Sequence, residues 1–437
     1  MRNILSKKYF IGCFLLIVFA VSDNLNAQKN WGTYSAVIPV QGYAGLNFRY
    51  KAFIRTEIED SDAAASIWVQ IKKKNGRGFA GNVNNLNIKN SDWKEYVLEG
   101  TIDEEYSQII VGLLGRFDGK FYFDDISFEV EEKDKTWKSI YQTGFEKKND
   151  GWRKGSGDGS GANIFFNGTV NENKPHKGKS CFVITASGVP NFGNNAKHGK
   201  FANVNGIKLY YEIYGEGHPL VVLHGNGGSI KDAAPQLPDL IKKYKVIAVD
   251  SRAQGKSTDT DAPLNYDIMA DDISALLDEL KIDSAFVWGQ SDGAILGLLM
   301  AMNHPTKVSK LLAFGANIQP DSLAVFNWGI AVFKKTINES SNEKKKKLMR
   351  LMLDYPNIPY SDLSKISIPV LVMAGDRDII RPEHTLKIFQ SIPKSQLCII
   401  PGSTHAASIE QKDLFLELLH NFFDKPFTMP TTEDWVK

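Results

Sequence analysis

The sequence predicts a protein of several domains, in which an all-β antiparallel sandwich precedes an α/β domain built on a mostly parallel sheet. Residues 31–132 alternate apolar and polar side chains with a period of two, as half-buried strands do. Residues 201–425 instead alternate short apolar runs with amphipathic segments of helical length. The total of 437 residues is more than one ordinary domain needs, so we expect these two patterns to form separate domains.

The first 27 residues have the pattern of a secretory signal peptide. Three basic residues precede an apolar run from Tyr9 to Val21, and Ala27 provides a small residue before the expected cleavage point. The run is shorter than the ~20 residues that a membrane-spanning helix needs. We therefore expect cleavage and export, which would make the protein secreted or periplasmic.

Composition excludes several kinds of partner and cofactor. The chain has 52 basic and 50 acidic side chains, and removal of the signal peptide takes away three basic residues and Asp23, which leaves a formal charge of zero. A neutral chain does not favour nucleic acid or an anionic membrane as a partner. Only Cys181 and Cys398 remain, in different predicted domains, and two lone cysteines indicate neither a metal site nor a disulfide framework. No cofactor is expected.

The alternating pattern of the N-terminal half is clearest in Tyr50–Ile58, Ile67–Ile71 and Tyr122–Val130. Turn-rich stretches such as Asp118-Gly119-Lys120 separate these runs. Short alternating runs with regular breaks are typical of an antiparallel sandwich.

Two phrases in this half resemble carbohydrate-binding jelly-roll modules. Gly144-Phe145-Glu146 with Gly151-Trp152, followed by His176–Lys179, resembles the opening of such a module, and Phe121–Ile126 resembles its closing strand. The closing phrase comes before the opening phrase, so there are either two modules or one composite sandwich over residues 28–188. We favour the composite sandwich, because the second segment alone would bury little core.

The C-terminal half begins with a predicted hairpin, because Asn205-Gly206 is a tight-turn dipeptide between two strand-like runs. Helical spacing of apolar residues follows at Ile268–Leu280. The predicted strands of the sheet are the apolar runs Leu220–Leu223, Val246–Val249, Ala285–Trp288, Leu311–Phe314, Val370–Met373 and Leu397–Ile400.

A candidate nucleophile follows one of these strands. Gly289-Gln290-Ser291-Asp292-Gly293 lies between the strand that ends at Trp288 and the helical segment Ala294–Asn303. In this context the two glycines allow a sharp turn that presents the Ser291 hydroxyl at the carboxyl end of the sheet. The alternative is a surface turn of small residues.

A serine hydroxyl needs a base, and the base needs an acid that orients it. His405 is the histidine in the loop that directly follows the last predicted strand. Asp376 and Asp378 both follow the preceding strand, and we favour Asp378 because Asp376 falls where a turn residue is expected. The sequence thus predicts Ser291 as nucleophile, His405 as base and Asp378 as acid.

The developing oxyanion needs preset hydrogen-bond donors. We expect these to be the backbone N–H of Asp292 and that of Asn226, in the loop His224–Gly228, with His224 shaping the loop. A phosphate cradle is the competing interpretation, but the loop lacks the Lys-Ser/Thr ending of a nucleotide-binding loop.

Taken together, residues 201–424 resemble the α/β-hydrolase superfamily, in the order Ser, Asp, His. The stretch Asp250–Ser257 is similar to the family's D-x-R-G-x-G-x-S motif, with Ala253 where glycine is usual, a departure expected to change only a turn. The resemblance implies a carboxylic ester hydrolase that needs no cofactor. Haloperoxidase-like and C–C bond hydrolases share the triad, whereas Ser291 argues against dehalogenases and epoxide hydrolases, which use an aspartate.

The resemblance also implies a short lid over residues 316–368, in which Phe326 and Trp328 are candidate substrate contacts. A small ester or an acylated glycan would suit a modest pocket. The N-terminal module is a candidate carbohydrate binder with Trp68 stacking on a sugar, the alternative being that its tryptophans pack the sandwich. A glycan-binding surface protein with an incidental hydrolase domain is therefore the competing function. The other tryptophans considered are Trp31, Trp93 and Trp152.

The predicted organisation is a signal peptide (1–27), a β-sandwich (28–188), a linker (189–200), an α/β domain (201–425) and a C-terminal tail (426–437).

Overall fold

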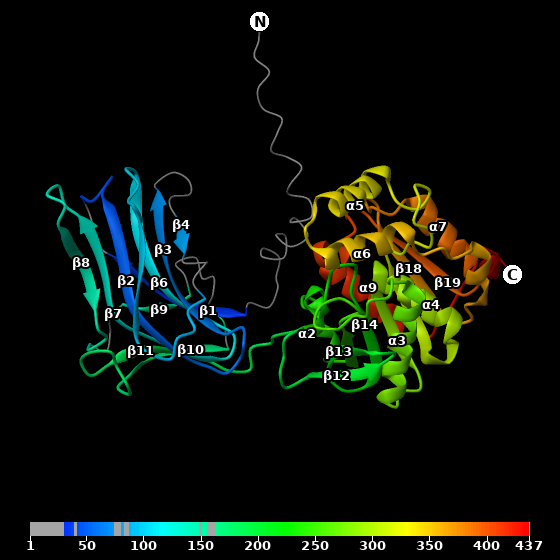
Figure 1. Cartoon of the computed structure of the whole chain (residues 1–437), viewed down its shortest axis with the longest axis horizontal. Helices are drawn as coiled ribbons and strands as arrows, with labels where there is room; N and C mark the ends of the chain where they lie inside the picture. Colours follow the sequence, from blue (N-terminus) through cyan, green and yellow to red (C-terminus); the bar gives the residue numbers. More distant parts are fainter. Residues whose placement is uncertain are drawn as a thin grey trace, which may run out of the picture. The chain divides into compact units, whose positions relative to one another are not determined.

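The computed structural model describes residues 30–38, 42–73, 80–82, 87–147, 151–155, 163 and 165–436. The predicted signal peptide lies outside the described residues. The chain divides between Asn194 and Asn195 into an N-terminal and a C-terminal unit, each of which has its own core (Figure 1).

The N-terminal unit consists of two antiparallel sheets. The five-stranded sheet has the order β4-β3-β6-β1-β9, and the other has the order β10-β11-β7-β2-β5 with β8 paired to β7. Apolar side chains from both sheets share one core, including Ile67 and Val69 from the first and Phe121 and Phe123 from the second. The strands are β1 (Trp31–Ile38), β2 (Asn47–Ile58), β3 (Ala64–Lys73), β4 (Ala80–Asn82), β5 (Lys94–Thr101), β6 (Tyr106–Arg116), β7 (Gly119–Glu131), β8 (Trp137–Thr143), β9 (Arg153–Lys154), β10 (Phe166–Asn171) and β11 (Cys181–Ala186).

The strands after residue 150 complete the same two sheets. β9 pairs with β1 in one sheet, whereas β10 pairs with β11, and β11 pairs with β7, in the other. The region that resembles a second module therefore belongs to one composite unit.

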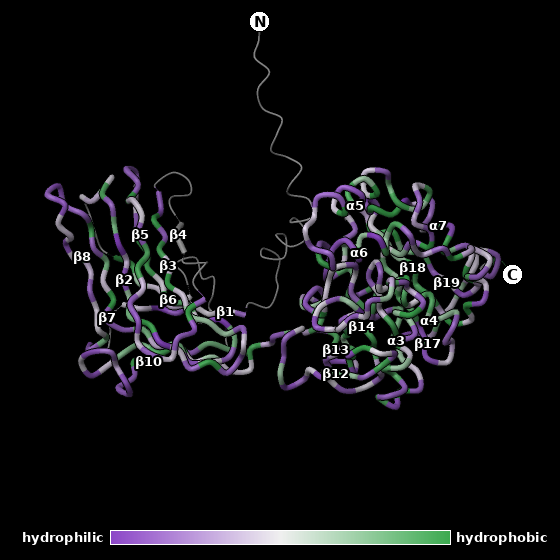
Figure 2. Tube along the Cα trace, viewed as in Figure 1, coloured by the Kyte–Doolittle hydropathy of each residue, from purple (hydrophilic) through white to green (hydrophobic). Residues whose placement is uncertain are grey.

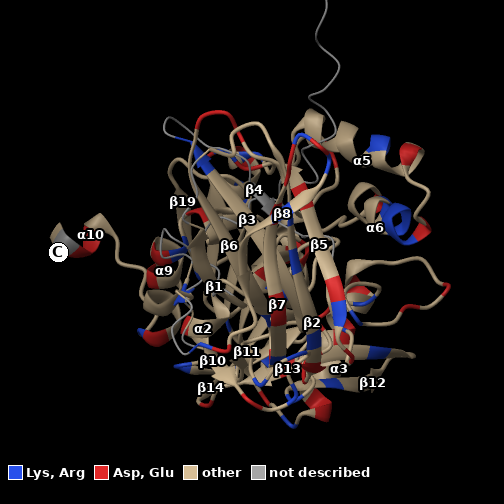
Figure 3. Ribbon diagram, turned by 90° about the vertical axis from the view of Figure 1, so that its left-hand side faces the viewer, with Lys and Arg blue, Asp and Glu red and all other residues tan. Residues whose placement is uncertain are grey.

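Charged side chains on the outer face of the second sheet pair across strands. Basic residues occur on β2 and acidic residues on the neighbouring β7 (Figure 3). Lys51 lies 2.7 Å from Glu129, and Arg49 also pairs with Glu129. This pairing accounts for the polar half of the alternation in β2.

The segment predicted as a linker, residues 189–200, is divided between the two units. The Asn191 side-chain amide donates to the Asp60 carboxylate at 2.9 Å in the N-terminal unit. The Asn195 N–H donates to Glu212 Oε1 at 2.9 Å in the C-terminal unit. The asparagines that favoured a linker thus bond to each unit, and the division between the units falls inside residues 189–200.

The C-terminal unit is built on an eight-stranded sheet with the order β12-β13-β15-β14-β16-β17-β18-β19. It begins antiparallel through β12, β13 and β15 and is parallel from β15 to β19. The predicted hairpin turn is present, with positive φ at Asn205 (44°) and Gly206 (79°). The strands are β12 (Gly199–Val204), β13 (Ile207–Tyr214), β14 (His218–Leu223), β15 (Tyr244–Val249), β16 (Ala285–Gln290), β17 (Val308–Phe314), β18 (Val370–Gly375) and β19 (Ser395–Ile400).

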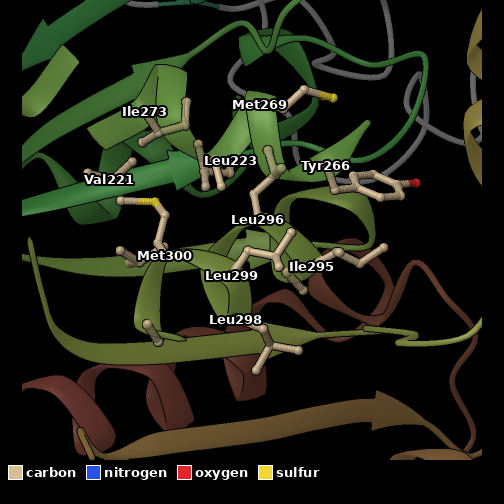
Figure 4. Close-up of a cluster of buried hydrophobic side chains, with 14 of the residues drawn as sticks. Val221, Leu223, Tyr266, Met269, Ile273, Ile295, Leu296, Leu298, Leu299 and Met300 are labelled. Atoms are coloured by element: carbon tan, nitrogen blue, oxygen red, sulfur yellow. The ribbon is translucent and has the colours of Figure 1, made fainter. Parts of the chain in front are cut away.

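Helices cover this sheet, and the chain is most hydrophobic along its central strands and α4 (Figure 2). Side chains of α3, α4 and β14 lie together in the core, among them Ile273, Leu296 and Leu223 (Figure 4). The predicted tail contains a short helix, α10, after α9 ends at Asp424. The helices are α2 (Leu237–Leu240), α3 (Tyr266–Glu279), α4 (Asp292–Asn303), α5 (Asn327–Glu339), α6 (Glu343–Asp354), α7 (Pro382–Ser391), α8 (Ala407–Glu410), α9 (Lys412–Asp424) and α10 (Thr432–Val436), with 3₁₀ turns η2 (Ile230–Ala233), η3 (Pro305–Lys307) and η4 (Tyr360–Lys365).

Within the described part of the chain, no helix combines the length and the apolar character that crossing a bilayer requires.

Candidate active site

Ser291 occupies the sharp turn between β16 and α4. Its φ of 54° lies in the left-handed region, which side-chain-bearing residues rarely adopt, and its N–H donates to Phe314 O at 2.8 Å. A Cβ on Gly289 would lie 2.1 Å from the carbonyl oxygen of Gly293, and one on Gly293 would lie 2.3 Å from that of Leu223. Both glycines are therefore required by close backbone approach, as the motif predicts.

His405 and Asp378 form a hydrogen-bonded pair beyond the ends of β19 and β18. The His405 Nδ1 lies 2.6 Å from Asp378 Oδ1, which also accepts the Ile380 N–H at 2.9 Å. The Asp378 side chain is 0% exposed, whereas that of His405 is 31% exposed. An ionised carboxylate only accepts, so Nδ1 carries a proton and Nε2 is left as the basic nitrogen.

Asp376, the other candidate acid, does not contact His405. Its Oδ1 accepts the Ser403 N–H at 3.1 Å, and hydrogen bonds from the backbone of Gly402 and Ser403 lower the pKa of Asp376. Asp376 therefore shapes the loop that leads to His405, while Asp378 supplies the partner of the imidazole.

The serine turn and the His–Asp pair meet around Phe314 and Gly315. The Ser291 N–H is bonded to Phe314, and a Cβ on Gly315 would lie 2.6 Å from His405 Cε1 and 3.5 Å from Asp378 Oδ2. Gly315 has a φ of 62°, so both space and backbone conformation favour glycine there. The backbone of the serine turn and the His405–Asp378 pair thus lie beside the same two residues at the carboxyl ends of neighbouring parallel strands, and a hydrogen bond between Ser291 Oγ and His405 stays a prediction.

A second link joins the two loops. Gln290, directly before the serine, donates from Nε2 to the carbonyl oxygen of His405 at 2.7 Å. Sequence reasoning missed Gln290 and Gly315 as site residues. Their sequence signal is position: Gly315 directly follows a predicted strand, and Gln290 lies between the strand that ends at Trp288 and the candidate nucleophile.

Burial and charge act in opposite directions on His405. Burial lowers the pKa of the imidazole, but the negative charge of Asp378, its hydrogen bond and the charge of Asp292 together raise that pKa above its usual value. Proximity to two carboxylates therefore strengthens His405 as a base and stabilises an imidazolium.

The predicted oxyanion loop lies against the serine. A Cβ on Gly225 would be 3.2 Å from Ser291 Cβ and 3.8 Å from its Oγ. Among the described residues, none accepts a hydrogen bond from the backbone N–H of Asn226 or of Asp292. Two uncommitted donors on segments beside the serine are what an oxyanion hole needs.

His224 shapes this loop. Its Nε2 accepts the Ser251 N–H at 3.0 Å, and its Nδ1 lies 2.7 Å from the Gly225 carbonyl oxygen. The D-x-R-x-x-G stretch supports the same loop, because Gln254 Oε1 accepts the Gly227 N–H at 2.6 Å. Both imidazole nitrogens of His224 are used in backbone contacts, which agrees with the role predicted for it.

Ala253 stands where the family motif has glycine, and its φ of 63° explains the usual preference. The alanine adopts the left-handed turn with its N–H donating to Thr258 O at 3.1 Å. The departure is thus accommodated within a turn.

Asp292 has a side-chain environment that the sequence did not predict. It is 2% exposed, and it accepts the Asn226 side-chain amide on Oδ2 and the Tyr266 hydroxyl on Oδ1, each at 2.9 Å. Burial raises the pKa of Asp292, and these two hydrogen bonds together with His224 and His405 oppose that rise.

The predicted lid region contains α5, α6 and η4. Phe326 is half-buried with the Arg381 guanidinium 4.5 Å from its ring centre, and Trp328 is 51% exposed. The Phe326 N–H donates to Ile379 O at 3.1 Å, which joins the start of the lid to the loop that carries Asp378. Phe326 therefore helps to anchor that loop, and the contact of either aromatic residue with substrate stays a prediction.

A cavity of about 250 Å³ lies beside the lid and is not the site of the three predicted catalytic residues. Its lining includes Tyr266 at the start of α3, Leu299 on α4 and Tyr355 directly after α6. Tyr266 connects it to the site, because its hydroxyl donates to Asp292.

Trp68 lies on the outer face of the five-stranded sheet, because its neighbours Ile67 and Val69 face the core. Its ring rests against Gly112, where a Cβ would lie only 1.9 Å from the indole, and its Nε1 donates to Thr33 Oγ1 at 2.7 Å. The side chain is held in place yet partly exposed.

Trp93 and Trp152, two of the other candidate tryptophans, are half-buried like Trp68. Trp152 packs beside Phe145 and Phe182 at the core, and Trp93 donates from Nε1 to Lys174 O at 3.3 Å. Both side chains therefore make contacts within the unit, as that of Trp68 does. Within the described residues, no group of three or more His, Cys, Asp or Glu side chains is placed to hold a metal ion.

Comparison with known proteins identifies relatives of the C-terminal unit. Residues 218–336 match the family model described as alpha/beta hydrolase fold. The chain is 28% identical over 278 residues to the serine hydrolase BPHL of Mus musculus, an alignment that covers 57% of this chain and 93% of that protein. It is 26% identical over 254 residues to the putative carbamate hydrolase RutD of a Caulobacter species, covering 49% of this chain and 95% of that protein. Among solved structures, the enol-lactonase of Burkholderia xenovorans is 20% identical, with a TM-score of 0.45, over 52% of this chain and 100% of that one.

Proposed function

We propose that this chain, whose C-terminal unit is an α/β-hydrolase enzyme, is an exported serine hydrolase that cleaves a carboxylic ester through an acyl-enzyme. The observation that carries the proposal is the gathering of the Ser291 turn and the His405–Asp378 pair around Gly315. A strained serine beside an oriented imidazole is the arrangement that activates a hydroxyl at neutral pH.

In the proposed reaction, His405 Nε2 removes the proton from Ser291 Oγ as that oxygen attacks the ester carbonyl carbon. The N–H groups of Asn226 and Asp292 stabilise the negative oxygen of the tetrahedral intermediate. The imidazolium then protonates the departing alcohol, which leaves an acyl group on Ser291. Water, deprotonated by His405, attacks the acyl group, and the serine is released with the carboxylic acid product.

The relatives favour a hydrolase but do not determine which bond the enzyme cleaves. The named relatives are a serine hydrolase and a putative carbamate hydrolase, and both names fit acyl transfer to water. A C–C bond hydrolase or a haloperoxidase-like enzyme would use the same three side chains. An ester of small size, or one carried by an acylated glycan, is the substrate class that we favour. A panel of chromogenic esters, carbamates and C–C hydrolase substrates separates these reactions.

A fluorophosphonate probe tests the proposal without a known substrate, because it labels activated serines. We expect labelling of the mature full-length protein, loss of labelling in Ser291→Ala, and unchanged labelling in Ser364→Ala, which alters an exposed serine of η4. Absence of labelling in the native protein, or persistence of labelling in Ser291→Ala, would refute the proposal.

We further propose that the N-terminal unit is a carbohydrate-binding module of the jelly-roll type. The position of Trp68 supports this, since a fixed and partly exposed indole is a suitable stacking surface for a sugar ring. Electrophoresis through gels containing plant or bacterial polysaccharides should retard the native protein and Trp137→Ala, but not Trp68→Ala. If this binding occurs while the fluorophosphonate probe labels nothing, the chain is instead a glycan-binding protein with an incidental hydrolase domain.

A further inference from the structure

We infer that the Asn226 side chain is a positioning residue that couples the lid helix α6 to the oxyanion hole. This inference rests on the proposed function. The Asn226 side-chain amide keeps the backbone N–H of the same residue in position beside the serine. It does so only while α6 is close enough for the Asn226–Leu348 hydrogen bond to form.

One side-chain amide connects three segments. The Asn226 Nδ2 donates to Asp292 Oδ2 at 2.9 Å, at the start of α4, and to the carbonyl oxygen of Leu348 at 3.2 Å, within α6. These acceptors are 66 and 122 residues away along the chain. An asparagine amide has two N–H groups, so both bonds form at once.

The orientation of this amide is fixed by its neighbours. A flipped amide would direct Asn226 Oδ1 at a carboxylate and a carbonyl oxygen, which are both acceptors. In the observed orientation, Oδ1 is buried and has no hydrogen-bond partner in the described part of the chain. An unsatisfied buried oxygen has a cost in free energy, which the two bonds made by Nδ2 offset.

The acceptor on α4 is rigid. Asp292 is buried, and its second oxygen accepts the Tyr266 hydroxyl from α3 at 2.9 Å. Since Asp292 also follows Ser291 directly, its carboxylate is fixed relative to the nucleophile. The Asn226 amide therefore sets the distance between the oxyanion loop and the serine turn.

The acceptor on α6 belongs to a helix with a second anchor. Leu348 is buried, and the adjacent Lys347 places its Nζ 2.6 Å from Asp259 Oδ2 and 2.8 Å from Thr260 O. α6 is thus fastened at neighbouring positions to the oxyanion loop and to the segment after β15. Displacement of α6 would break the Asn226–Leu348 bond together with the Lys347 contacts.

This arrangement has a kinetic consequence. Loss of the side-chain amide leaves the Asn226 N–H in the chain but no longer held beside the serine. The oxyanion exists only in the transition state and the tetrahedral intermediate, so misplacement of the donor lowers kcat while KM changes little.

The test compares Asn226→Ala with Asn357→Ala. The Asn357 amide also bonds to a carbonyl oxygen of α6, that of Asp354 at 2.7 Å, but it is exposed and does not touch the oxyanion loop. We expect Asn226→Ala to lower kcat by about 10- to 100-fold with KM within about 2-fold, less than the 10²–10³ of a deleted donor. Binding of a boronic acid transition-state analogue should weaken by the same factor. Asn357→Ala should leave all three quantities unchanged.

Two further variants guard against a general loss of structure. Lys347→Ala removes the second anchor of α6 with Asn226 intact, and should lower kcat by about 2- to 5-fold, also without a change in KM. The double variant Asn226→Ala with Asp292→Ala should lose less activity than the product of the single losses, because each single variant removes the same Asn226–Asp292 bond.

The outcomes separate the inference from the function on which it rests. If the fluorophosphonate probe does not label the native protein, the proposed function fails and the inference fails with it. If labelling occurs but Asn226→Ala retains its kcat, changes only KM, or loses boronate affinity no more than Asn357→Ala does, the inference alone is overturned.

Discussion

Each unit of the molecule contains a His–Asp pair of the same length. His405 Nδ1 lies 2.6 Å from Asp378 in the C-terminal unit, and His176 Nδ1 lies 2.6 Å from Asp125 in the N-terminal unit. The His176 ring also stacks on Phe53, with ring centres 3.8 Å apart and planes 13° from parallel. The bond itself therefore does not distinguish a site of chemistry from a structural contact.

The difference lies in the surroundings of the two pairs. Both members of the N-terminal pair are partly exposed, with side chains 21% and 29% accessible, and the His176 N–H donates to the buried Asp124 at 2.8 Å. This histidine fastens the loop before β11 to the sheet. Asp378 is instead fully buried, and the ring of His405 lies beside Gly315, directly after Phe314, whose carbonyl oxygen accepts the Ser291 N–H. The candidate catalytic pair therefore differs from the structural pair in two ways: its acid is buried, and it lies where the ends of parallel strands come together.

The largest expected effect is the loss of activity on removing the His405 imidazole, and removal of the His176 imidazole is its control. His405→Ala should lower ester turnover by about 10⁴-fold or more, because the base that activates the serine is lost. His176→Ala should change turnover by less than about 2-fold, since that ring stacks on Phe53 and bonds to Asp125 within the N-terminal unit. Steady-state rates on a chromogenic ester measure both. Comparable losses in the two variants would abolish the distinction between the pairs.

The next largest effect should come from removing the charge of Asp378, with the same change at Asp125 as its control. Asp378→Asn should reduce kcat by about 10³- to 10⁴-fold, because the imidazole loses the partner that sets its tautomer. Asp125→Asn, which alters the matching acid of the N-terminal unit, should keep its activity. Retention of native kcat in Asp378→Asn would indicate that His405 does not depend on this acid.

The pH dependence of serine labelling tests the protonation of His405 directly. The pKa of His405 is raised, so the rate of fluorophosphonate labelling should increase with pH through a midpoint above about 6.5. Asp378→Asn should move that midpoint down. Because the folded-state pKa exceeds the unfolded one, the pair stabilises the fold most below about pH 6.5, and this contribution is lost as pH rises through the folded-state value. A flat profile between pH 5 and 8 would count against His405 as the base.

The smallest effect is expected for stability of the N-terminal unit. Loss of the stacked ring in His176→Ala should lower the free energy of unfolding by about 0.5–1.5 kcal/mol, the range for such ring pairs. Denaturant titration followed by tryptophan fluorescence would detect this change, with Lys174→Ala as an exposed control on the same loop. An unchanged midpoint would mean that the ring contact contributes nothing to folding.

Much of the C-terminal unit could be predicted from local patterns. The six predicted apolar runs all lie within strands of the sheet, and the Asn205-Gly206 turn joins β12 to β13. We favoured Asp378 because Asp376 falls where a turn residue is expected, and the structure brings Asp378 to His405. Such features follow from the sequence because strand period, turn chemistry and loop position are local properties.

Contacts between distant segments could not be predicted. The division between the two units falls inside residues 189–200, but the pairing of Asn191 and Asn195 with acids more than a dozen residues away has no local signal. Trp93 and Trp152 make contacts within their own unit, as Trp68 does, and their contact with a sugar stays a prediction. The amino-acid composition of a segment indicates which side chains can form hydrogen bonds, but it does not indicate which distant residues they bond to.

The sequence by itself determined the order of strands and helices, the strained serine turn and the loops that carry the histidine and its acid, because each depends on neighbours in the chain. Only the tertiary structure decided that Gly315 opens space for His405, that Gln290 holds its backbone, and that Asn226 joins α4 to α6. These contacts connect strand ends and helices far apart in sequence, and their geometry exists only once the parallel sheet has brought those ends to one edge.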